Sequence, residues 1–486
     1  MADSTPVFPP VAVPQVPRWQ SLLRSFALAK DPVSVLDATM ARYGDTVQLY
    51  IGGVQKSMLT QDPGLIQHIL QKNHRNYAKS KFTQGFARYV GHGLLTNEGP
   101  DWLRQRRLIQ PGFHRQRVAG LTGLMQEIVA ETLAPLIAQA TESGGEVTVQ
   151  THELMTQLTF RIIARSVFST NFAAAELDRV AALITEIQAF YVRTIRQPYL
   201  TPWFRLSGRF RYHDALTTEL RELLGGYIQQ RRQANEAPTA PAPPDDLLQM
   251  LLDVRYEDTG LPMTTAQVLD EALILLIAGH ETSANALTWL LYLVAQNPSE
   301  AVAIRTETAA VLAGRPPEQA AAPFTFEELP RLGRALYAVQ EALRHYPPAW
   351  MVDRLSLADD DYQGLHIPKG TLFSLYIYGL HHDAKHWERP AEFCPLRFAP
   401  GQGPLVPAAY APFGGGPRLC IGMQFALTEM QLVTLELLRQ FEVQLVAGQL
   451  PVSTQPLITL RPKGDFELRL RQIDKNVCNP ERRAAE

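Results

Sequence analysis

Hydrophobic residues recur with a helical period along most of the chain, and a few shorter stretches alternate as strands do. The alternation over 46–60 is interrupted by two adjacent glycines, which predicts a β-hairpin. A second helical block is expected from 246 to 346, and strand patterns return over 355–377 and after 441. These patterns predict a mainly α fold, with a large helical body and a smaller β-rich region.

The chain has no internal repeat, so we expect one large domain over 41–470. The segment 1–40 is rich in proline, and Pro9, Pro10, Pro14 and Pro17 disfavour a helix at its start. An alanine- and proline-rich stretch over 232–246 predicts a surface loop between two helical regions. Residues 471–486 are expected to form a polar tail.

Composition excludes several classes of protein. The 486 residues carry 46 basic and 48 acidic side chains, a formal net charge of -2, which argues against a nucleic-acid binder. The most apolar stretch, 272–279, is too short to span a bilayer, and the N-terminus lacks a signal-peptide pattern, so we expect no membrane anchor. The three cysteines, Cys394, Cys420 and Cys478, are too few for a disulfide framework and indicate a reducing compartment such as the cytoplasm.

One of these cysteines follows a glycine-rich loop and precedes an amphipathic helical pattern. In "APFGGGPRLCIGM" Phe413 could shield the sulfur of Cys420, and Arg418 adds a cation two residues before it. Gly416 and Gly422 let the backbone approach a flat partner closely. A helix N-terminus stabilises a thiolate, so we expect a lowered pKa for this thiol and a metal-binding role for it. The alternative is a buried, inert cysteine.

The five residues named in this loop form the pattern F-x-x-G-x-R-x-C-x-G, which resembles the haem-binding loop of the cytochrome P450 superfamily. The resemblance extends over most of the chain and implies the cytochrome P450 fold, with 41–470 as its catalytic domain. It implies that Cys420 is the axial thiolate ligand of haem b. It also implies a monooxygenase that inserts one atom of O2 into a C–H bond of an apolar molecule.

A second motif lies in the long apolar helix predicted over 273–294. Its "AGHETS" segment resembles the oxygen-activation motif of the same family, which implies that Glu281 and Thr282 form an acid–alcohol pair. Ala278 lies four residues before Thr282 and therefore on the same helical face, and Gly279 removes bulk beside them. The alternative is a core helix whose threonine bonds its own i−4 carbonyl.

A third motif pairs a carboxylate with a guanidinium on one helix. Glu341 and Arg344 in "EALRHYPP" resemble the family's E-x-x-R motif, which implies a buried structural pair behind the haem loop. The comparison includes Arg397 of "CPLRF", where Leu396 replaces the family's usual glutamate and weakens the prediction of a full network. The alternative is a solvated i,i+3 ion pair.

Three further residues are implied to hold the haem propionates. Trp102 and Arg106 in "DWLRQRRLIQPGFH" share a helical face and resemble the family's W-x-x-x-R pair, and Arg354 matches another family arginine. Arginine suits a carboxylate because it can bind both oxygens at once. The alternative is a basic surface helix.

The resemblance also implies a substrate pocket, and the helix around Leu276 is expected to form part of its wall. An apolar and aromatic lining favours a fatty acid or a terpenoid. Each of these side chains could equally belong to the core. The expected pocket residues are Phe82, Phe86, Tyr89, Trp350, Met351, Val352, Leu457 and Ile458.

Rival functions are weaker. His381, His382 and His386 lie close together in "HHDAKH", but their spacing is not that of a zinc hydrolase. A peroxide-driven peroxygenase and a non-catalytic haem-binding sensor also fit a haem-thiolate loop, and the Glu281-Thr282 pair favours the monooxygenase over both.

No flavin- or iron–sulfur-binding segment follows the cysteine loop. We therefore expect electrons from a separate ferredoxin or flavodoxin with its NAD(P)H reductase. Such donors are acidic, so basic side chains near the cysteine are candidate contacts, with simple solvation as the alternative. These candidates are Arg104, Arg107, Arg115 and Arg117.

Overall fold

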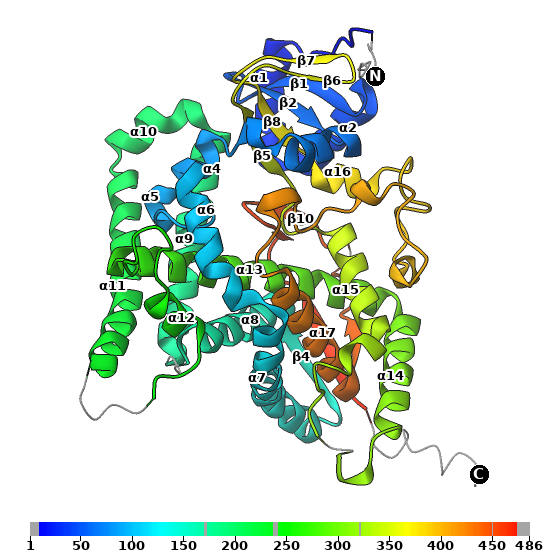
Figure 1. The fold of residues 1–486 in the computed structure, drawn as a ribbon. Coiled ribbons are helices and arrows are strands. Elements are labelled where there is room, and N and C mark those ends of the chain that lie inside the picture. The colour runs from blue at the N-terminus through cyan, green and yellow to red at the C-terminus, as the bar shows by residue number, and fades with distance from the viewer. Residues whose placement is uncertain (1–8, 170–172, 237–241, 320–321, 450, 474–486) are drawn as a thin grey trace, which may run out of the picture.

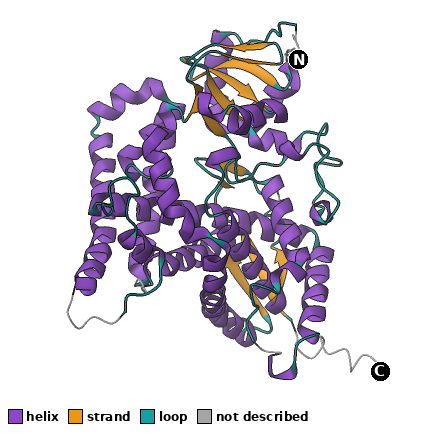
Figure 2. Ribbon diagram, viewed as in Figure 1, coloured by secondary structure: helices purple, strands orange, loops and turns teal. Residues whose placement is uncertain are grey.

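The computed structural model describes residues 9–169, 173–236, 242–319, 322–449 and 451–473, and Cys478 lies outside them. Helices form most of the body, and the strands gather in separate small sheets (Figure 1 and Figure 2). This arrangement confirms the mainly α prediction. The α-helices are α1 Arg18–Lys30, α2 Pro32–Tyr43, α3 Pro63–Gln67, α4 Lys81–Gly85, α5 Ala87–Val90, α6 Gly99–Ile109, α7 Arg115–Glu142, α8 Thr151–Phe168, α9 Ala174–Arg196, α10 Thr201–Leu206, α11 Arg209–Glu236, α12 Leu247–Asp253, α13 Thr265–Gln296, α14 Pro298–Ala313, α15 Gly333–His345, α16 Ile377–His382 and α17 Met423–Gln440.

Short turns of other helix types connect these elements. The turn η1, His68–Lys72, is a π-helix that continues α3 and packs against the cysteine loop. The remaining turns are 3-10 helices: η2 His74–Asn76, η3 Gln110–Phe113, η4 Pro198–Leu200, η5 Pro317–Gln319, η6 Leu329–Arg331, η7 Pro395–Phe398, η8 Pro407–Ala409 and η9 Gly416–Arg418.

The largest sheet has the strand order β1-β2-β8-β5-β3 and lies at one end of the molecule (Figure 1). Its β1–β2 hairpin turns at Gly52 and Gly53, both with positive φ, as the glycine pair predicted. The strands β2 and β8 run parallel, so segments more than 300 residues apart meet in this sheet. The strands are β1 Thr46–Ile51, β2 Gln55–Thr60, β3 Tyr77–Ala78, β4 Glu146–Gln150, β5 Val352–Ser356, β6 Asp360–Tyr362, β7 Leu365–Ile367, β8 Leu372–Leu375, β9 Phe441–Leu445, β10 Thr454–Pro456, β11 Leu460–Pro462 and β12 Glu467–Gln472.

The helix α13 runs through the middle of the helical body (Figure 1). It packs most extensively on α8, and it also contacts α11, α15 and α17. Its residues are apolar around most of the circumference, and 22 of its 32 residues are buried. A helix that is apolar on all sides must be enclosed by other elements. The polar segment that begins at His280 therefore lies in the interior of the protein.

The first two helices belong to the folded body. The predicted boundary at residue 40 falls inside α2, which packs with α1 against β1. The stretch 9–17, which holds Pro9, Pro10, Pro14 and Pro17, is not helical, as the prolines predicted. Pro32 stands in the first turn of α2, where a missing N–H costs no hydrogen bond. At the other end, β12 continues to Gln472, two residues beyond the predicted end of the domain.

Among the described residues, one helix has the length and apolar composition to cross a membrane, namely α7. In the fold α7 packs against α8, α17 and β4. Buried side chains of α7 such as Met125, Ile128 and Val129 belong to the main hydrophobic core. Burial within the protein accounts for 33% of the apolar window of α7.

Candidate functional site

A cavity of about 650 Å³ extends between α13, the start of α17, the β5 strand and α9. Cys420 lies on its wall, as do Ala278 and Thr282 of α13. Residues from more than a dozen elements line the cavity, so the site exists only in the folded chain. Most of the lining is apolar, which is typical of sites for small molecules and cofactors.

The cysteine loop is held by its own backbone and by η1. The Cys420 amide donates to the Phe413 carbonyl at 3.0 Å, and Phe413 lines the cavity beside the sulfur. Gly416 has a φ of +64°, and a Cβ there would collide with the Leu70 carbonyl oxygen. Gly416 is therefore required because its backbone lies close to the Leu70 backbone of the same chain, and not because of a flat partner. Gly422 is the N-cap of α17, and a Cβ there would make only ordinary contact with Phe113.

The pKa of the Cys420 thiol is raised, whereas the sequence predicted a lowered pKa. Burial among apolar groups raises the pKa of the Cys420 thiol. The Gly422 N–H and the Arg106 charge act in the opposite direction, as a helix N-terminus and a cation should, but burial outweighs them. A metal ion removes the proton from a thiol that coordinates it, so a resident metal would supply the missing stabilisation.

Cationic side chains gather on one part of the cavity wall. The Arg418 guanidinium stacks 3.7 Å from the centre of the Trp102 ring and pairs with Glu98 at 2.6 Å. Arg354 is buried on the same wall, and its one hydrogen bond in the described structure goes from Nη1 to the Asp353 carbonyl. Burial lowers the pKa of Arg418 to about 10 and also lowers the pKa of Arg354. Such a cluster is suited to one or more carboxylates.

Sequence reasoning missed Lys79, which completes this cluster. Its ammonium group donates to the Leu95 carbonyl, and the side chain lines the cavity. Burial lowers the pKa of Lys79 to about 7, and the charges of Arg418 and Arg354 act in the same direction. Nothing in the local sequence separates Lys79 from the exposed Lys81, because the burial of Lys79 is created by segments distant in the chain.

Arg106 lies beside the cysteine loop, where Nη1 donates to the Leu419 carbonyl at 2.9 Å. Neither Arg106 nor Trp102 lines the cavity directly, although Trp102 packs behind Arg418. Burial lowers the pKa of Arg106, and the neighbouring Cys420 raises it. The structure therefore brings the predicted propionate-binding residues to one side of the site.

The α13 segment presents Ala278, Gly279 and Thr282 to the cavity. The Thr282 hydroxyl donates to the Ala278 carbonyl at 2.6 Å, the i−4 bond that the core-helix alternative describes. Glu281 faces another direction, and its carboxylate accepts a 2.5 Å hydrogen bond from Thr459. A threonine hydroxyl can exchange this local partner for a bound molecule, so both interpretations of Thr282 are compatible with its position.

Seven of the eight predicted pocket residues line the cavity, namely Phe82, Phe86, Trp350, Met351, Val352, Leu457 and Ile458. Tyr89 does not; it is buried behind the wall, with its ring 5.9 Å from the Tyr191 ring in an edge-on contact. On α13 the wall includes Leu275, and Leu276 is turned into the core. Sequence reasoning missed the face of α9, which contributes Tyr191, Val192, Ile195 and Arg196.

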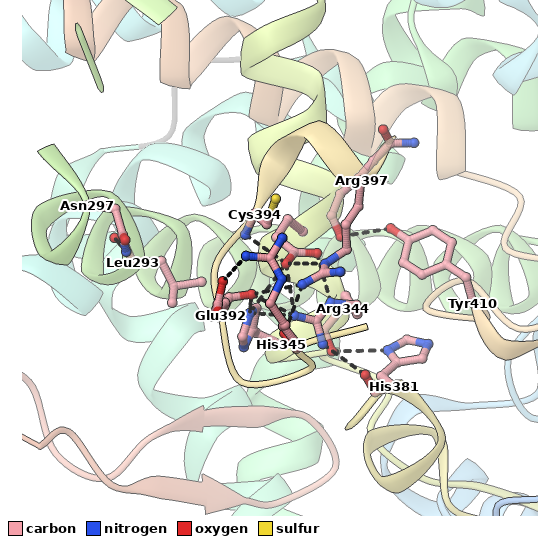
Figure 3. A network of polar contacts seen from close by, with 12 residues as sticks. Leu293, Asn297, Arg344, His345, His381, Glu392, Cys394, Arg397 and Tyr410 are labelled. Atoms are coloured by element: carbon pink, nitrogen blue, oxygen red, sulfur yellow. Dashed lines mark hydrogen bonds and ion pairs between the residues drawn. The ribbon is translucent and has the colours of Figure 1, made fainter. Parts of the chain in front are cut away.

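Glu341 and Arg344 form a fully buried ion pair at 2.8 Å behind the cysteine loop. Arg397 donates from Nε to Glu341 at 3.1 Å, and the Cys394 amide donates to the same oxygen at 3.0 Å (Figure 3). The network is therefore complete without a glutamate at position 396. Leu396 is 45% exposed, so the replaced position lies at the surface, outside the buried network.

The three histidines of "HHDAKH" do not converge. Nδ1 of His381 contacts the Arg344 carbonyl, and Nε2 accepts from the Ala411 amide, so both nitrogens are used within the fold. The ring of His382 stacks on Tyr378 and contacts its carbonyl. No cluster of three or more histidine, cysteine or acidic side chains suited to a metal ion occurs within the described ranges.

A second buried carboxyl, Glu429, lies on α17 nine residues after Cys420. Its side chain is fully buried, and neither carboxylate oxygen has a hydrogen-bond partner within ordinary distance in the described structure. Burial raises the pKa of Glu429 to about 8, and the neighbouring Ser283 of α13 offsets this only in part. Sequence could have revealed this residue, because Glu429 falls four residues after Phe425 on the apolar face of its helix.

Replacing Glu429 with glutamine should change how stability depends on pH. The raised pKa means that the folded state keeps a proton that the unfolded state loses above about 4.5. Stability from this group therefore falls as pH rises from 4.5 to about 8, by roughly 4 kcal/mol in all. Urea unfolding at pH 6 and pH 8.5 should show a smaller pH dependence in E429Q. The exposed Glu388→Gln should match the unsubstituted protein, and an E429Q protein with the same pH dependence would contradict the assignment.

These residues fit a haem with an axial thiolate. One sulfur faces a mainly apolar cavity, and three cations line one part of the wall, where the two carboxylates of the haem would be neutralised. Arg418 pairs with Glu98, but Lys79 and Arg354 have no carboxylate partner among the described residues. A buried cation without a counter-charge is costly, so an anionic partner best explains these two side chains. The residues that would hold the group are Cys420, Phe413, Arg418, Arg354, Lys79, Trp102 and Arg106.

Comparisons with known proteins agree with this geometry. The sequence matches the family model described as Cytochrome P450 over residues 11–468. It is 31% identical to cyclooctatin synthase of Streptomyces melanosporofaciens over 447 residues, covering 91% of this chain and 90% of that protein. It is 30% identical to 11-oxo-beta-amyrin 30-oxidase of Glycyrrhiza uralensis, covering 90% and 84% of the two chains.

The fold is also shared with solved structures. The crystal structure of the cytochrome P450DA haem domain superposes with a TM-score of 0.82 at 26% identity, covering 97% of this chain and 99% of that one. Sequence and fold thus agree over nearly the whole length of the chain. The chain belongs to the cytochrome P450 family and is an oxidoreductase of the monooxygenase class.

Proposed function

We propose that this monooxygenase holds haem b through Cys420 and hydroxylates an apolar terpenoid or fatty acid. The observation that carries the proposal is the shared cavity. The sulfur of Cys420 and the small-residue segment of α13 line the same apolar chamber. The overall reaction takes O2, two electrons and two protons, and gives a hydroxylated product and water. Bound haem would supply the activation of O2 that no amino-acid side chain can provide.

The side chains of the chain have three tasks in this scheme. Cys420 ligates the iron, and the cationic cluster of Lys79, Arg354 and Arg418 neutralises the haem carboxylates. Ala278 and Gly279 keep space open beside Thr282, and Gly279 also lets α8 pack closely, since a Cβ there would lie 2.8 Å from Ile163. The apolar walls exclude water and orient the substrate.

Thr282 and Glu281 are proposed to deliver protons. The Thr282 hydroxyl would hold a proton at the cavity surface, and Glu281 would connect it to the polar group around Thr459 and His152. Glu281 lies about 100° around the helix from Thr282, so it would act through solvent or through neighbouring groups.

Thr282→Ala should therefore lower the yield of product per electron pair consumed. The electrons that do not form product should reduce O2 to peroxide instead. Thr288→Ala is the matched control, because Thr288 makes the same i−4 bond, at 2.7 Å to Ala284, but lies outside the cavity lining. Coupling is measured as product formed per NADH oxidised with a surrogate ferredoxin and its reductase. Equal coupling in both variants would show that the Thr282 hydroxyl serves only its helix.

The substrate class rests on the lining and on the relatives. The names of both relatives contain a terpenoid, cyclooctatin in one and beta-amyrin in the other, and the cavity walls are apolar and partly aromatic. The first test is titration of the haem-loaded protein with terpenoids and fatty acids while the Soret band is followed. A saturable shift from low spin to high spin with one class would identify the substrate class, and a spectrum without thiolate character would overturn the proposal.

Electrons are proposed to come from a separate ferredoxin or flavodoxin with its NAD(P)H reductase, and the reaction is proposed to take place in the cytoplasm. Of the predicted contacts, Arg104 and Arg107 pair with Asp258 and Glu257 on the surface. Arg117 pairs with Asp245, while Arg115 lies over the Phe326 ring. These exposed pairs are weak, so an acidic partner can compete for the arginines.

A further inference from the structure

One cation of the cavity wall lies away from the cluster around Cys420. Arg196 is the last residue of α9, and it reaches the cavity together with Val192 and Ile195 of the same helix face. Its Nη2 donates to the Pro456 carbonyl in β10. The Arg196 carbonyl lies near Gly52 in the β1–β2 turn. Arg196 therefore marks the region where α9, this turn and the β10–β11 hairpin meet, whereas Cys420 lies among α6, η9 and α17.

Arg196 has no carboxylate partner among the described residues. Two other arginines of the interior do have one: Arg344 pairs with Glu341, and Arg231 pairs with Asp246 at 2.8 Å. Burial lowers the pKa of Arg196 to about 10, with no acidic group to offset it. A single carbonyl satisfies one of the five N–H groups of a guanidinium, so most of its hydrogen-bonding capacity is unused.

The surroundings of Arg196 are otherwise apolar. The nearby cavity lining includes Ile51, Ile195, Leu457 and Ile458. Arg196 is partly buried, and a cation withdrawn from water without a counter-charge is unfavourable. A structural need for the Pro456 contact alone would be met by an uncharged donor. The guanidinium matches the geometry of a carboxylate, which it can bind through two parallel hydrogen bonds.

We propose that Arg196 binds the carboxylate of an amphipathic substrate, whose apolar body extends along the cavity toward Cys420. This inference rests on the proposed function and makes it more specific. It selects terpenoid acids or fatty acids over neutral terpenoids. It also fixes the orientation of the substrate, so oxygen is inserted into a C–H bond remote from the carboxylate.

The test compares a carboxylic acid with its methyl ester, which has the same apolar body without the charge. Tetradecanoic acid and abietic acid are titrated against their methyl esters by calorimetry on the haem-loaded protein. Of the two acids, the one that binds more tightly should have an affinity about 10- to 100-fold higher than that of its methyl ester. This ratio is expected for a charge-assisted hydrogen bond in an apolar site. Arg196→Gln should abolish this difference and leave the ester affinity unchanged, and Arg196→Lys should restore part of it.

Arg193→Gln is the matched control. Arg193 is exposed one turn earlier on α9, bonds to Gln197 and lies outside the cavity lining, so its variant should keep the preference for the acid. Equal affinities for acid and ester in the unsubstituted protein, or an R196Q protein that still prefers the acid, would overturn the role of Arg196. The Soret spectrum without ligand reports separately on haem-thiolate ligation, so failure of the proposed function would be recognised independently.

Discussion

Cys420→Ser should abolish monooxygenase turnover and remove the thiolate signature from the haem spectrum. The substitution replaces the sulfur by oxygen and leaves the loop backbone intact, since the hydrogen bond from residue 420 to Phe413 uses only main-chain atoms. A serine hydroxyl does not ionise near neutral pH and is a poor ligand for haem iron. Loss of an outer-shell partner of a metal ligand already costs about 10- to 100-fold, so loss of the ligand itself should cost more.

Cys394→Ser is the control for this experiment. Cys394 is also a free cysteine, but its described hydrogen bonds use only backbone atoms: the amide donates to Glu341, and the carbonyl accepts from the Arg397 amide. Its variant should keep both the spectrum of the reduced, carbon monoxide-bound protein and the turnover rate. Circular dichroism would verify that both variants are folded. A Cys420→Ser protein with an unchanged thiolate spectrum would contradict the assignment of the ligand.

The parts of the site that sequence predicted well are those whose atoms lie close together in the chain. The cysteine loop brings Phe413 and Cys420 together through a turn of a few residues, and Glu341 and Arg344 need only one helical turn. In both cases local backbone geometry decides which side chains meet. Tertiary packing was needed only to bury them.

The parts that sequence missed depend on distant segments. The burial of Lys79 depends on its contact with Leu95 and on Arg354 and Arg418, which come from far along the chain. Arg196 meets Pro456, 260 residues away. No periodicity reports such a meeting, because the charge of a side chain and its spacing are the same whether its surroundings are water or a cavity.

The different surroundings of Glu281 and Thr282 on α13 could have been predicted from the sequence. Successive residues of a helix point about 100° apart, so the neighbours Glu281 and Thr282 can face different surroundings. The structure places Thr282 on the cavity wall and turns Glu281 to Thr459. The acid–alcohol pair is therefore adjacent in sequence but divided between two environments.

The second large effect is expected at Glu341, where glutamine should destabilise the fold by about 3–5 kcal/mol. Its two oxygens accept from Arg344, Arg397 and the Cys394 amide, and the pair is inaccessible to solvent. Glutamine keeps the shape but removes the charge, and it places an N–H₂ group where an acceptor is needed. Two buried guanidinium groups then lose their counter-charge.

The matched control is Glu392→Gln. Glu392 also pairs with an arginine three residues away, Arg389, but both side chains are more than half exposed. Because an exposed ion pair contributes about 0–1 kcal/mol, this variant should unfold at nearly the same urea concentration as the unsubstituted protein. Equal destabilisation by the two substitutions would show that burial of the Glu341 pair has no special importance.

The pH dependence of unfolding provides a second, independent measure of the same pair. Burial alone would raise the pKa of Glu341, but hydrogen bonds from Arg344 and His345 and the Arg344 charge outweigh it and hold the pKa at about 2. The folded carboxyl thus binds a proton less readily than the unfolded one. Its stabilisation is fully present above about pH 4.5 and is lost as pH falls from there toward 2. Glu341→Gln should remove this acid-labile component, so its unfolding free energy should fall less steeply below pH 5 than that of Glu392→Gln.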